Sequence, residues 1–174
     1  MVDINQLEEY NDSAIENFVR YKVNHSISPI RLKKNPFKVA NLDWSHVPYG
    51  DGQVDDVPDD KRGIYAFSIT TDSPVLPPHG YILYIGIAGH NSMRSLRSRY
   101  KDYLNTKKVI KRAHINRMIV TWNDVLRFCF APINNDVSAA DLIELEKELN
   151  DALMPPFSRG DMSAELKAAR RAFP

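Results

Sequence analysis

Three short apolar runs, joined by connections of very different length, place the strongest limit on how this chain can fold. The first covers residues 63–69 and alternates, with Tyr65, Phe67 and Ile69 on one face, and the second covers residues 81–87. Between them lies the stretch TTDSPVLPPHG, whose three prolines and single glycine are typical of a loop. The two runs therefore predict an antiparallel hairpin with a long connection.

A third strand is predicted over residues 125–130, where large apolar side chains recur at every second position. Helical periodicity is found in five further segments, residues 4–22, 94–105, 107–119, 138–153 and 162–172. Ser138 and Asp141 have the spacing of a capping box, and two prolines follow the helix that they start. A hairpin, one more strand and several helices predict an α+β fold, with a small three-stranded antiparallel sheet flanked by helices.

The first 60 residues differ in character from the rest. After the helical segment they contain four prolines, and they run into the acidic, turn-rich stretch GDGQVDDVPDDK at 50–61. We expect this stretch to be an exposed loop at a boundary. The chain is therefore divided into an N-terminal helical and irregular extension, residues 1–60, and a domain, residues 61–174.

The 174 residues are 43% apolar and 26% charged, an ordinary balance for one globular domain with its own core. Cys129 is the single cysteine, which excludes a disulfide within the chain and a multi-cysteine zinc site, and we expect it in the core. No apolar run approaches the ~18 residues of a membrane-spanning helix. The first residues, MVDINQLEEYNDS, lack the basic and apolar regions of a signal peptide, so we expect a cytoplasmic protein without a membrane partner.

The formal net charge of +1 conceals a strong segregation of charge. Residues 1–60 carry six Lys or Arg against eleven Asp or Glu. Residues 94–117, the basic block, carry nine Lys or Arg against one acid, Asp102. Such a block is typical of a phosphate-binding face, although a solvated pair of Lys-rich helices would show it as well. The candidate nucleic-acid contacts are Arg94, Arg97, Lys101, Lys107, Lys108, Lys111, Arg112 and Arg117.

Short motifs lie on the predicted hairpin and on the helix after it. The first strand contains GIY at 63–65 and the second contains YIG at 84–86. The following helix contains LRSR at 96–99, and Tyr103 lies one turn beyond Arg99 on the same face. Each tripeptide alone is a weak signal, because strands favour tyrosine and isoleucine in any case.

A closing pattern lies far downstream. Glu146 is on the predicted helix, an apolar residue stands three positions later at Leu149, and PPFS follows at 155–158. In this order, over residues 63–158, the motifs resemble those of the GIY-YIG nuclease family. The resemblance does not extend to residues 1–60.

The resemblance implies a metal-dependent endonuclease that hydrolyses DNA phosphodiester bonds with one divalent cation, Mg²⁺ or Mn²⁺. Arg99 would bind a phosphate through two nitrogen atoms, and Glu146 would hold the cation together with water and phosphate oxygens. Tyr65 would contact the attacking water as a hydrogen-bond partner or, with a lowered pKa, as a general base. The expected catalytic residues are Tyr65, Tyr84, Arg99, Glu146, Tyr103 and His114.

Three of these residues have supporting roles in this interpretation. Tyr84 would orient the water or a phosphate oxygen, and Tyr103 would position the phosphate beside Arg99. His114, inside the basic block, would contact phosphate or carry a proton, although it is equally compatible with an ordinary surface histidine.

Helix geometry distinguishes Glu146 from the acids on either side of it. At ~100° per residue, Glu146 lies about 60° from the centre of the leucine stripe, whereas Glu144 and Glu148 lie about 140° and about 100° away. Glu146 is therefore the acid nearest the core side, where a metal site facing the sheet is expected. The alternative is an ion pair with a lysine on the same helix.

The chain departs from the family pattern at three places. The loop at 70–80 is longer than is usual, and Ser158 stands where the family has asparagine. The insertion AGHNSMRS after the second strand makes Arg94 a competitor for the arginine role, but Leu96 supplies the apolar anchor at the offset that favours Arg99.

Other interpretations remain open at this point. Tyr65 and Tyr84 are also compatible with ordinary structural aromatics of a strand. The same fold could belong to a non-catalytic nucleic-acid-binding module. It could also belong to a protein–protein interaction module that acts through residues 1–60. For a nuclease, a restriction, repair or phage-defence role is expected. Specificity would then come from the 70–80 loop, the insertion at 88–95, residues 1–60, a homodimer or a partner protein.

Overall fold

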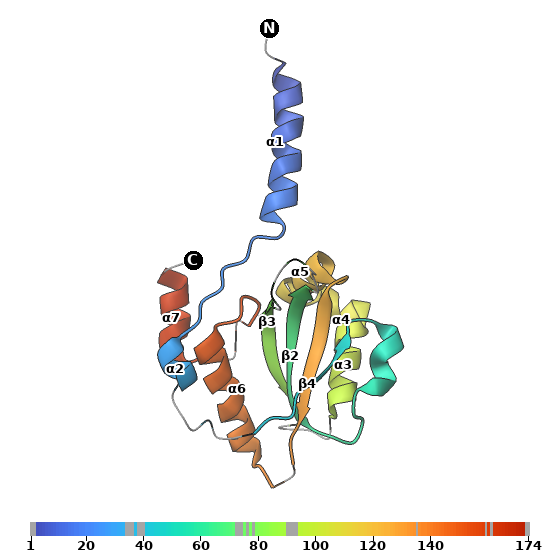
Figure 1. Ribbon diagram of the computed structural model, residues 1–174, viewed down its shortest axis with the longest axis vertical. Helices are drawn as coiled ribbons and strands as arrows, with labels where there is room; N and C mark the ends of the chain where they lie inside the picture. Colours follow the sequence, from blue (N-terminus) through green and yellow to red (C-terminus); the bar gives the residue numbers. More distant parts are fainter. Residues whose placement is uncertain are drawn as a thin grey trace.

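The computed structural model describes residues 3–33, 37, 41–71, 75, 77, 79–89, 94–134, 136–158, 160 and 162–172. Its strands are β1 (Ser45–Pro48), β2 (Gly63–Thr71), β3 (His79–Ala88) and β4 (Leu126–Pro132). Its helices are α1 (Ile4–Val19), α2 (Pro29–Lys33), the 3₁₀ helix η1 (Asp51–Asp56), α3 (Leu96–Leu104), α4 (Thr106–Ile110), α5 (Ala113–Trp122), α6 (Ala139–Leu153) and α7 (Ala164–Ala172). The sheet lies between two groups of helices (Figure 1).

The strands form one antiparallel sheet in the order β1-β4-β2-β3. The α+β class is confirmed, and β2, β3 and β4 correspond to the three predicted strands. The predicted strand number is wrong, because β1 adds a fourth strand at the edge beside β4. Only Val47 of β1 is buried, so the local sequence carries little strand signal and the pairing with β4 defines the strand. Part of the expected N-terminal extension therefore belongs to the sheet.

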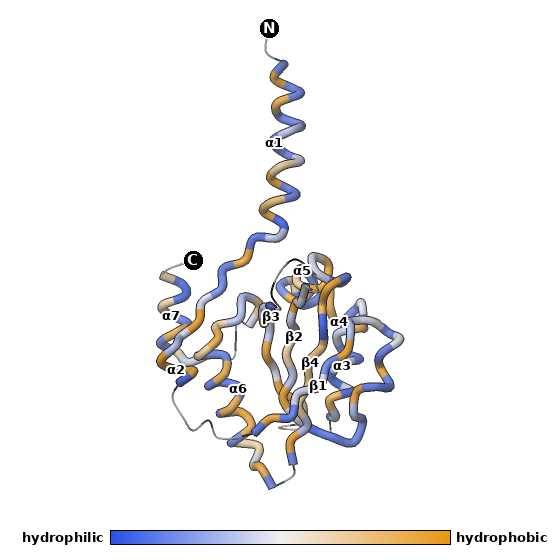
Figure 2. The backbone as a smooth tube through the Cα atoms, in the orientation of Figure 1, coloured by the Kyte–Doolittle hydropathy of each residue, from blue (hydrophilic) through white to orange (hydrophobic). Residues whose placement is uncertain are grey.

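The sheet separates two cores. On one side, which we call the aromatic face, Tyr65 and Phe67 of β2 pack with residues of α3 and α5. On the other, the aliphatic face, Ile64 and Ala66 of the same strand pack with residues of α6. The alternation of β2 produces this division, because successive side chains point to opposite sides of a sheet. The apolar residues of the strands stand out along the tube in Figure 2.

An extra residue in β3 changes its pairing with β2. Phe67 pairs with Tyr84 and Ser68 pairs with Ile82, so Leu83 lies in a bulge between them. Leu83 and Tyr84 consequently both belong to the aromatic-face core. Tyr84 lies on the same side of the sheet as Tyr65 through the regular pairing that precedes the bulge, and the bulge brings Leu83 to that side as well.

The single helix predicted over residues 107–119 is wrong, because the structure has two helices there. Lys111 follows the end of α4, and Arg112 adopts φ −119° and ψ 80°, outside the helical region, before α5 begins. Val109 and Ile115 are buried on either side of the break. Their spacing of six residues is not a helical repeat, so the two helices bury different faces. The break has no proline or glycine to mark it in the sequence.

The predicted capping box of α6 is confirmed, since Ser138 Oγ accepts a hydrogen bond from the Asp141 amide at 3.0 Å. Met154 ends the helix with a positive φ of 42°, followed by the two prolines. The predicted loop at 70–80 and insertion at 88–95 lie partly outside the described residues, at 72–74, 76, 78 and 90–93.

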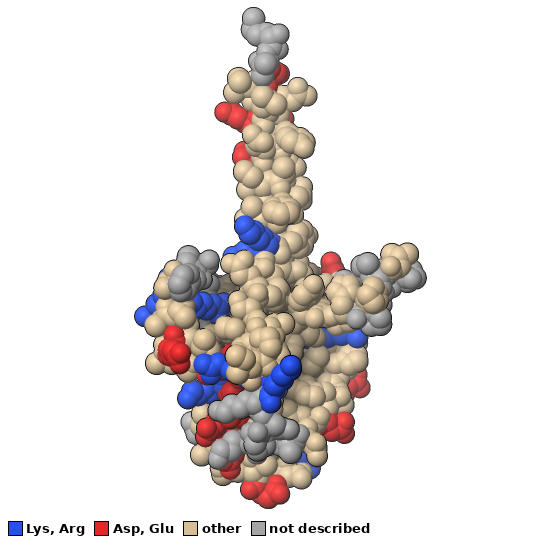
Figure 3. Space-filling view, turned by 60° about the vertical axis from the view of Figure 1, so that its left-hand side comes forward, with Lys and Arg blue, Asp and Glu red and all other residues tan. Residues whose placement is uncertain are grey.

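The helix α1 agrees with the predicted N-terminal helix, but none of its residues is buried. It stands away from the sheet as an arm (Figure 1), so Leu7, Ile15 and Phe18 are exposed along it. Acidic side chains lie along the arm, and Lys and Arg atoms gather at its base (Figure 3). The apolar residues of α1 therefore do not contribute to the core of the domain.

Candidate active site

Tyr65 lies on the central strand β2, and its side chain is fully buried on the aromatic face. Its partner across the hairpin is Gly86 of β3. A Cβ atom on Gly86 would collide with the Tyr65 hydroxyl and would lie 3.0 Å from a ring carbon of Tyr84. The glycine of the second motif therefore makes room for the tyrosine of the first.

Hydrogen bonds join the Tyr65 hydroxyl to α3. Its oxygen lies 2.7 Å from the Tyr103 hydroxyl oxygen, and Arg99 Nε donates to it at 3.0 Å. Arg99 and Tyr103 are four residues apart and share one face of the helix, while buried Leu96 fixes that face toward the sheet. The spacing of Leu96, Arg99 and Tyr103 along the helix therefore places the guanidinium and the Tyr103 hydroxyl within hydrogen-bonding distance of the buried Tyr65 hydroxyl oxygen.

Tyr84 completes this group of side chains. Its ring centroid lies 6.2 Å from the ring centroids of both Tyr65 and Tyr103, and its side chain is nearly buried. We call Tyr65, Tyr84, Arg99 and Tyr103 the tyrosine–arginine cluster. Four of the six predicted catalytic residues are therefore brought together, from two strands and one helix.

Arg99 connects the cluster to solvent, because its side chain is 30% exposed. Burial opposes its charged form, but the Tyr65 and Tyr103 hydroxyls outweigh burial and raise the pKa of Arg99. The guanidinium therefore remains a cation at every physiological pH. A fixed and partly exposed guanidinium is suited to hold a phosphate group.

The pKa of Tyr65 is raised well above its usual value, first by burial and then by the neighbouring Tyr103 and Tyr84, while Arg99 acts in the opposite direction. The hydroxyl is therefore protonated at neutral pH. Arg99 already donates a hydrogen bond to the Tyr65 hydroxyl oxygen. The proton of the Tyr65 hydroxyl can therefore be donated to Tyr103 or to a bound acceptor. A role as general base would need additional positive charge nearby.

Asp102 is a site residue that the motifs do not reveal. Its side chain is 12% exposed and binds three cations: Arg94 Nη1 at 3.0 Å, Arg99 Nη1 at 3.6 Å and Lys108 Nζ. It gives the Arg99 guanidinium a second anchor besides Tyr65. The signal that would have found it is the i,i+3 spacing of Arg99 and Asp102 on a helix, together with its position as the single acid of the basic block.

Three of the predicted nucleic-acid contacts are engaged within the protein. Arg94 and Lys108 bind Asp102, as described. Arg97 donates to the carbonyl oxygens of Val57 and Asp55 at 2.7 and 2.8 Å. Arg97 thereby fastens the acidic segment around η1 to α3, which is a structural use of its guanidinium.

The remaining members of the basic block face either the cluster or solvent. Arg112 Cζ lies 4.5 Å from the centroid of the Tyr103 ring. Four further members are exposed, namely Lys101, Lys107, Lys111 and Arg117. These four side chains are therefore the ones that the structure presents to an extended polyanion.

Glu146 lies on α6, directly after Leu145, which is buried against the aliphatic face. It is half-buried, and its carbonyl oxygen accepts a hydrogen bond from Asn150 Nδ2 at 2.9 Å. Glu144 is exposed, as expected, and Glu148 is half-buried. The tyrosine–arginine cluster is on the other face of the sheet, and its described hydrogen bonds and ion pairs do not reach Glu146.

His114 is half-buried near the start of α5. The described hydrogen bonds of the cluster do not include it either. The contacts described above join four of the six predicted catalytic residues, while Glu146 lies on α6 and His114 lies on α5.

The donor set restricts where a divalent cation would bind. Within the described ranges, no group of three or more His, Cys, Asp or Glu side chains is arranged to hold a metal ion. The Asp102 oxygens are taken by three cationic side chains. Of the residues in the sequence motifs, Glu146 is the carboxylate that could bind a divalent cation. One carboxylate together with water and substrate phosphate oxygens is an ordinary arrangement for Mg²⁺.

The residues after α6 cover the outer edge of β3. The Phe157 amide donates to the Leu83 carbonyl at 2.9 Å, and the Ile85 amide donates to Ser158 Oγ at 3.1 Å. Ser158 is fully buried. Ser158 therefore bonds directly to the strand that contains the YIG sequence.

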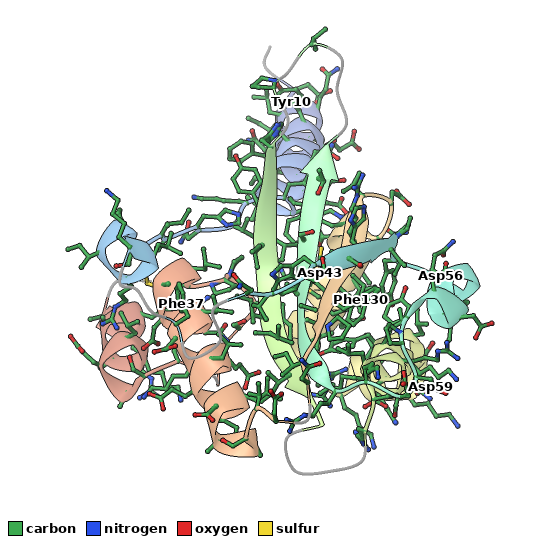
Figure 4. The ribbon with its side chains drawn as sticks, turned by 60° about the horizontal axis from the view of Figure 1, so that its bottom comes forward. Tyr10, Phe37, Asp43, Asp56, Asp59 and Phe130 are labelled. Carbon is green, nitrogen blue, oxygen red and sulfur yellow. The ribbon has the colours of Figure 1, made fainter. Side chains whose placement is uncertain are left out.

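Two concave regions lie away from the cluster. One, between α2 and α6, is lined by Arg31, Phe37, Glu144, Lys147, Glu148 and Asp151. The other, beside the edge strand β1, includes Asp43, His46, Asp56 and Phe130 (Figure 4). Both contain carboxylates, which repel a phosphate. The tyrosine–arginine cluster, and not either hollow, is therefore the candidate phosphate site.

Comparisons with protein-family models, with curated proteins and with solved structures find no match to this chain. Across the part of the chain that the structure describes, no helix has the length and apolar character needed to cross a membrane. What the protein does is therefore inferred from the geometry of its own residues.

Proposed function

We propose that the protein is a metal-dependent endonuclease of the GIY-YIG type that hydrolyses phosphodiester bonds in DNA. The observation that carries the proposal is the convergence of Arg99 Nε and the Tyr103 hydroxyl on the Tyr65 hydroxyl, next to a glycine that leaves room for it. Packing alone does not require a buried hydroxyl to be held by a partly exposed arginine. The pair offers a hydrogen-bond partner for water and a cation for phosphate in one place.

In the proposed reaction, Arg99 binds a non-bridging oxygen of the scissile phosphate and stabilises the charge that develops there. Tyr65, protonated at neutral pH, orients the attacking water through its hydroxyl, and the rings of Tyr84 and Tyr103 fix its position. Glu146 would hold Mg²⁺ or Mn²⁺, and the cation, when bound, supplies positive charge to the phosphoryl and leaving-group oxygens. A role in restriction, repair or phage defence fits such an activity.

A non-catalytic nucleic-acid-binding module is the second candidate. It is favoured by the position of Glu146 on α6, against the aliphatic face, while the described bonds of the cluster lie on the other face. Such a module would keep phosphate binding by Arg99 and by the exposed lysines, but it would not cut.

Cleavage of supercoiled plasmid tests the proposal. The wild type, Tyr65→Phe and Glu146→Ala would be compared with Mg²⁺ and with a chelator, and Glu144→Ala, an exposed acid on the same helix, is the matched control. We expect Mg²⁺-dependent nicking by the wild type and Glu144→Ala. Loss of one group that acts in the transition state lowers the rate by about 10² to 10³, so Tyr65→Phe and Glu146→Ala should be nearly inactive.

One outcome would contradict the nuclease proposal, and another would contradict only the role given to Glu146. A wild type that binds plasmid but does not cut it with Mg²⁺ or Mn²⁺ would favour the binding module. Cutting that Glu146→Ala leaves unchanged would remove Glu146 from the metal site.

A further inference from the structure

Arg112 is a second guanidinium at the tyrosine–arginine cluster. Its Cζ lies 4.5 Å from the Tyr103 ring centroid, and Arg99 Cζ lies 5.9 Å from the same centroid. Two cations therefore lie against one aromatic ring, which attracts each of them. They also repel each other, and an anion bound to both would remove that repulsion.

The charge around the two arginines is not balanced equally. Arg99 has Asp102 at 3.6 Å and the Tyr65 hydroxyl at 3.0 Å. For Arg112, the described acids offer no ion pair. Its Nη2 is buried, with no hydrogen-bond partner among the described residues. Buried charged donors in native proteins are almost always satisfied by protein, water or a ligand, so this nitrogen atom is a vacant donor beside the cluster.

The backbone holds Arg112 in this place. It is the non-helical residue between α4 and α5, and buried Val109 and Ile115 anchor the two helices on either side. The break directs its side chain against Tyr103 of α3. The residue as a whole is partly exposed, while its Nη2 atom is buried.

We propose that Arg112 and Arg99 bind the same phosphate group, so that the site is a two-arginine phosphate clamp beside the Tyr103 ring. This inference rests on the proposed function, because it names the second group that holds the phosphodiester to be cut. Arg99 takes one non-bridging oxygen and Arg112 takes another through its vacant nitrogen. With two guanidinium groups, both oxygens are stabilised as negative charge develops on them.

Binding of inorganic phosphate tests the clamp without any cleavage. The full chain would be titrated with phosphate while the side-chain Nε–Hε signals of its arginines are followed by NMR, for the wild type, Arg99→Gln, Arg112→Gln and Arg171→Gln. Arg171 is the control, since it is an exposed arginine on α7, outside the basic block. Losing one charged hydrogen bond weakens binding about tenfold or more, so Arg99→Gln and Arg112→Gln should each show that loss, and Arg171→Gln should not.

Single-turnover cleavage of plasmid gives an independent readout. We expect Arg112→Gln to lower the rate at saturating DNA about 10²-fold while the affinity for DNA changes little. Arg117→Gln should lower the affinity for DNA, while the rate at saturating DNA changes little. Arg112→Lys keeps the cation but loses the planar fork, so its rate should fall between the two. It also serves as the deciding variant if Arg112→Gln has a lowered thermal midpoint.

The outcomes separate this inference from the proposed function. If Arg112→Gln binds phosphate as the wild type does, the clamp is wrong. If the wild type cuts and Arg112→Gln cuts as fast as Arg117→Gln, the clamp is also wrong, but the nuclease proposal stands. If phosphate binding depends on both arginines and the wild type never cuts DNA, the clamp stands and the nuclease proposal is wrong.

Discussion

At residue 86 the absence of a side chain is what allows the tyrosine–arginine cluster to form. Gly86→Ala would place a methyl group against the Tyr65 hydroxyl and 3.0 Å from the Tyr84 ring. Overpacking of a core costs about 1–3 kcal/mol, so we expect the free energy of unfolding in urea to fall by that amount and phosphate binding to weaken. The control is Gly52→Ala, because a Cβ at Gly52 has no atom within 4 Å. Equal stability of the two variants would show that the ring of Tyr65 does not need this space.

Asp102 acts at the same scale, through the arginine that it holds. Asp102→Asn keeps the shape of the side chain but removes the charge that anchors Arg99, Arg94 and Lys108. Misplacing a catalytic group by about 1 Å costs about 10²-fold in rate, so kcat should fall by 10-fold or more while KM changes little. Asp102→Glu should restore part of the rate, and exposed Asp60→Asn should have no effect. A variant that lowers only the thermal midpoint would make Asp102 a purely structural residue.

The residues of the cluster differ in how far the sequence predicts them. Tyr65, Arg99 and Tyr103 are predictable, because strand alternation and the helical repeat place motif residues on known faces. Asp102 is predictable only in part, through its i,i+3 spacing from Arg99, because its pairing with Lys108 depends on how α3 and α4 pack. Arg112 is not predictable, because its place beside Tyr103 comes from packing between α3, α4 and α5, which no local pattern encodes. The position of Glu146 relative to the leucine stripe is predicted by helix geometry, but its place relative to the cluster depends on how α6 packs on the sheet.

At the scale of the elements, Tyr49 ties the segment after β1 to α3, since its hydroxyl donates to the Tyr103 carbonyl oxygen at 2.7 Å. Burial, followed by Tyr100 and Asp51, raises the pKa of Tyr49 to about 12. Its usual value is about 10. Because the folded state holds the proton more tightly than the unfolded state, the contribution of Tyr49 is complete below pH 10 and is lost as the pH rises toward 12.

Urea unfolding of the wild type and Tyr49→Phe at several pH values measures this contribution. The wild type should be the more stable at pH 8, and the difference should shrink between pH 10 and 12. A difference that stays constant across this range would mean that the Tyr49 proton is not linked to folding.

Long elements of this fold are predictable and short ones are not. The strands β2 and β4 and the helix α6 have alternating or periodic apolar residues that local sequence reveals. The strand β1 has one buried residue, the bulge at Leu83 lies inside an apolar run, and no proline or glycine marks the break before α5. These features are set by tertiary pairing, which outweighs local propensity.

For the whole molecule, α1 should be dispensable for folding. None of its residues is buried, so deleting residues 1–19 removes almost no apolar contact. We expect the thermal midpoint to change by less than about 2 °C, whereas Leu142→Ala in the buried stripe of α6 should cost about 2–5 kcal/mol. A clearly lower midpoint for the deletion would show that α1 packs on the body in solution.

Asp102 and the carbonyl oxygens near η1 occupy arginine and lysine side chains of the basic block. Under the proposed function, this occupation would limit how tightly the protein holds nucleic acid in general. Each cation that meets a phosphate releases condensed counterions, and the logarithm of affinity falls with the logarithm of salt by about 0.9 per contact. Nine contacts would give a slope of about −8, whereas the four exposed cations and the two arginines at Tyr103 would give about −5. We therefore expect a nuclease with this face to release most duplexes readily at physiological salt and to stay bound longest where a phosphate reaches the tyrosine–arginine cluster.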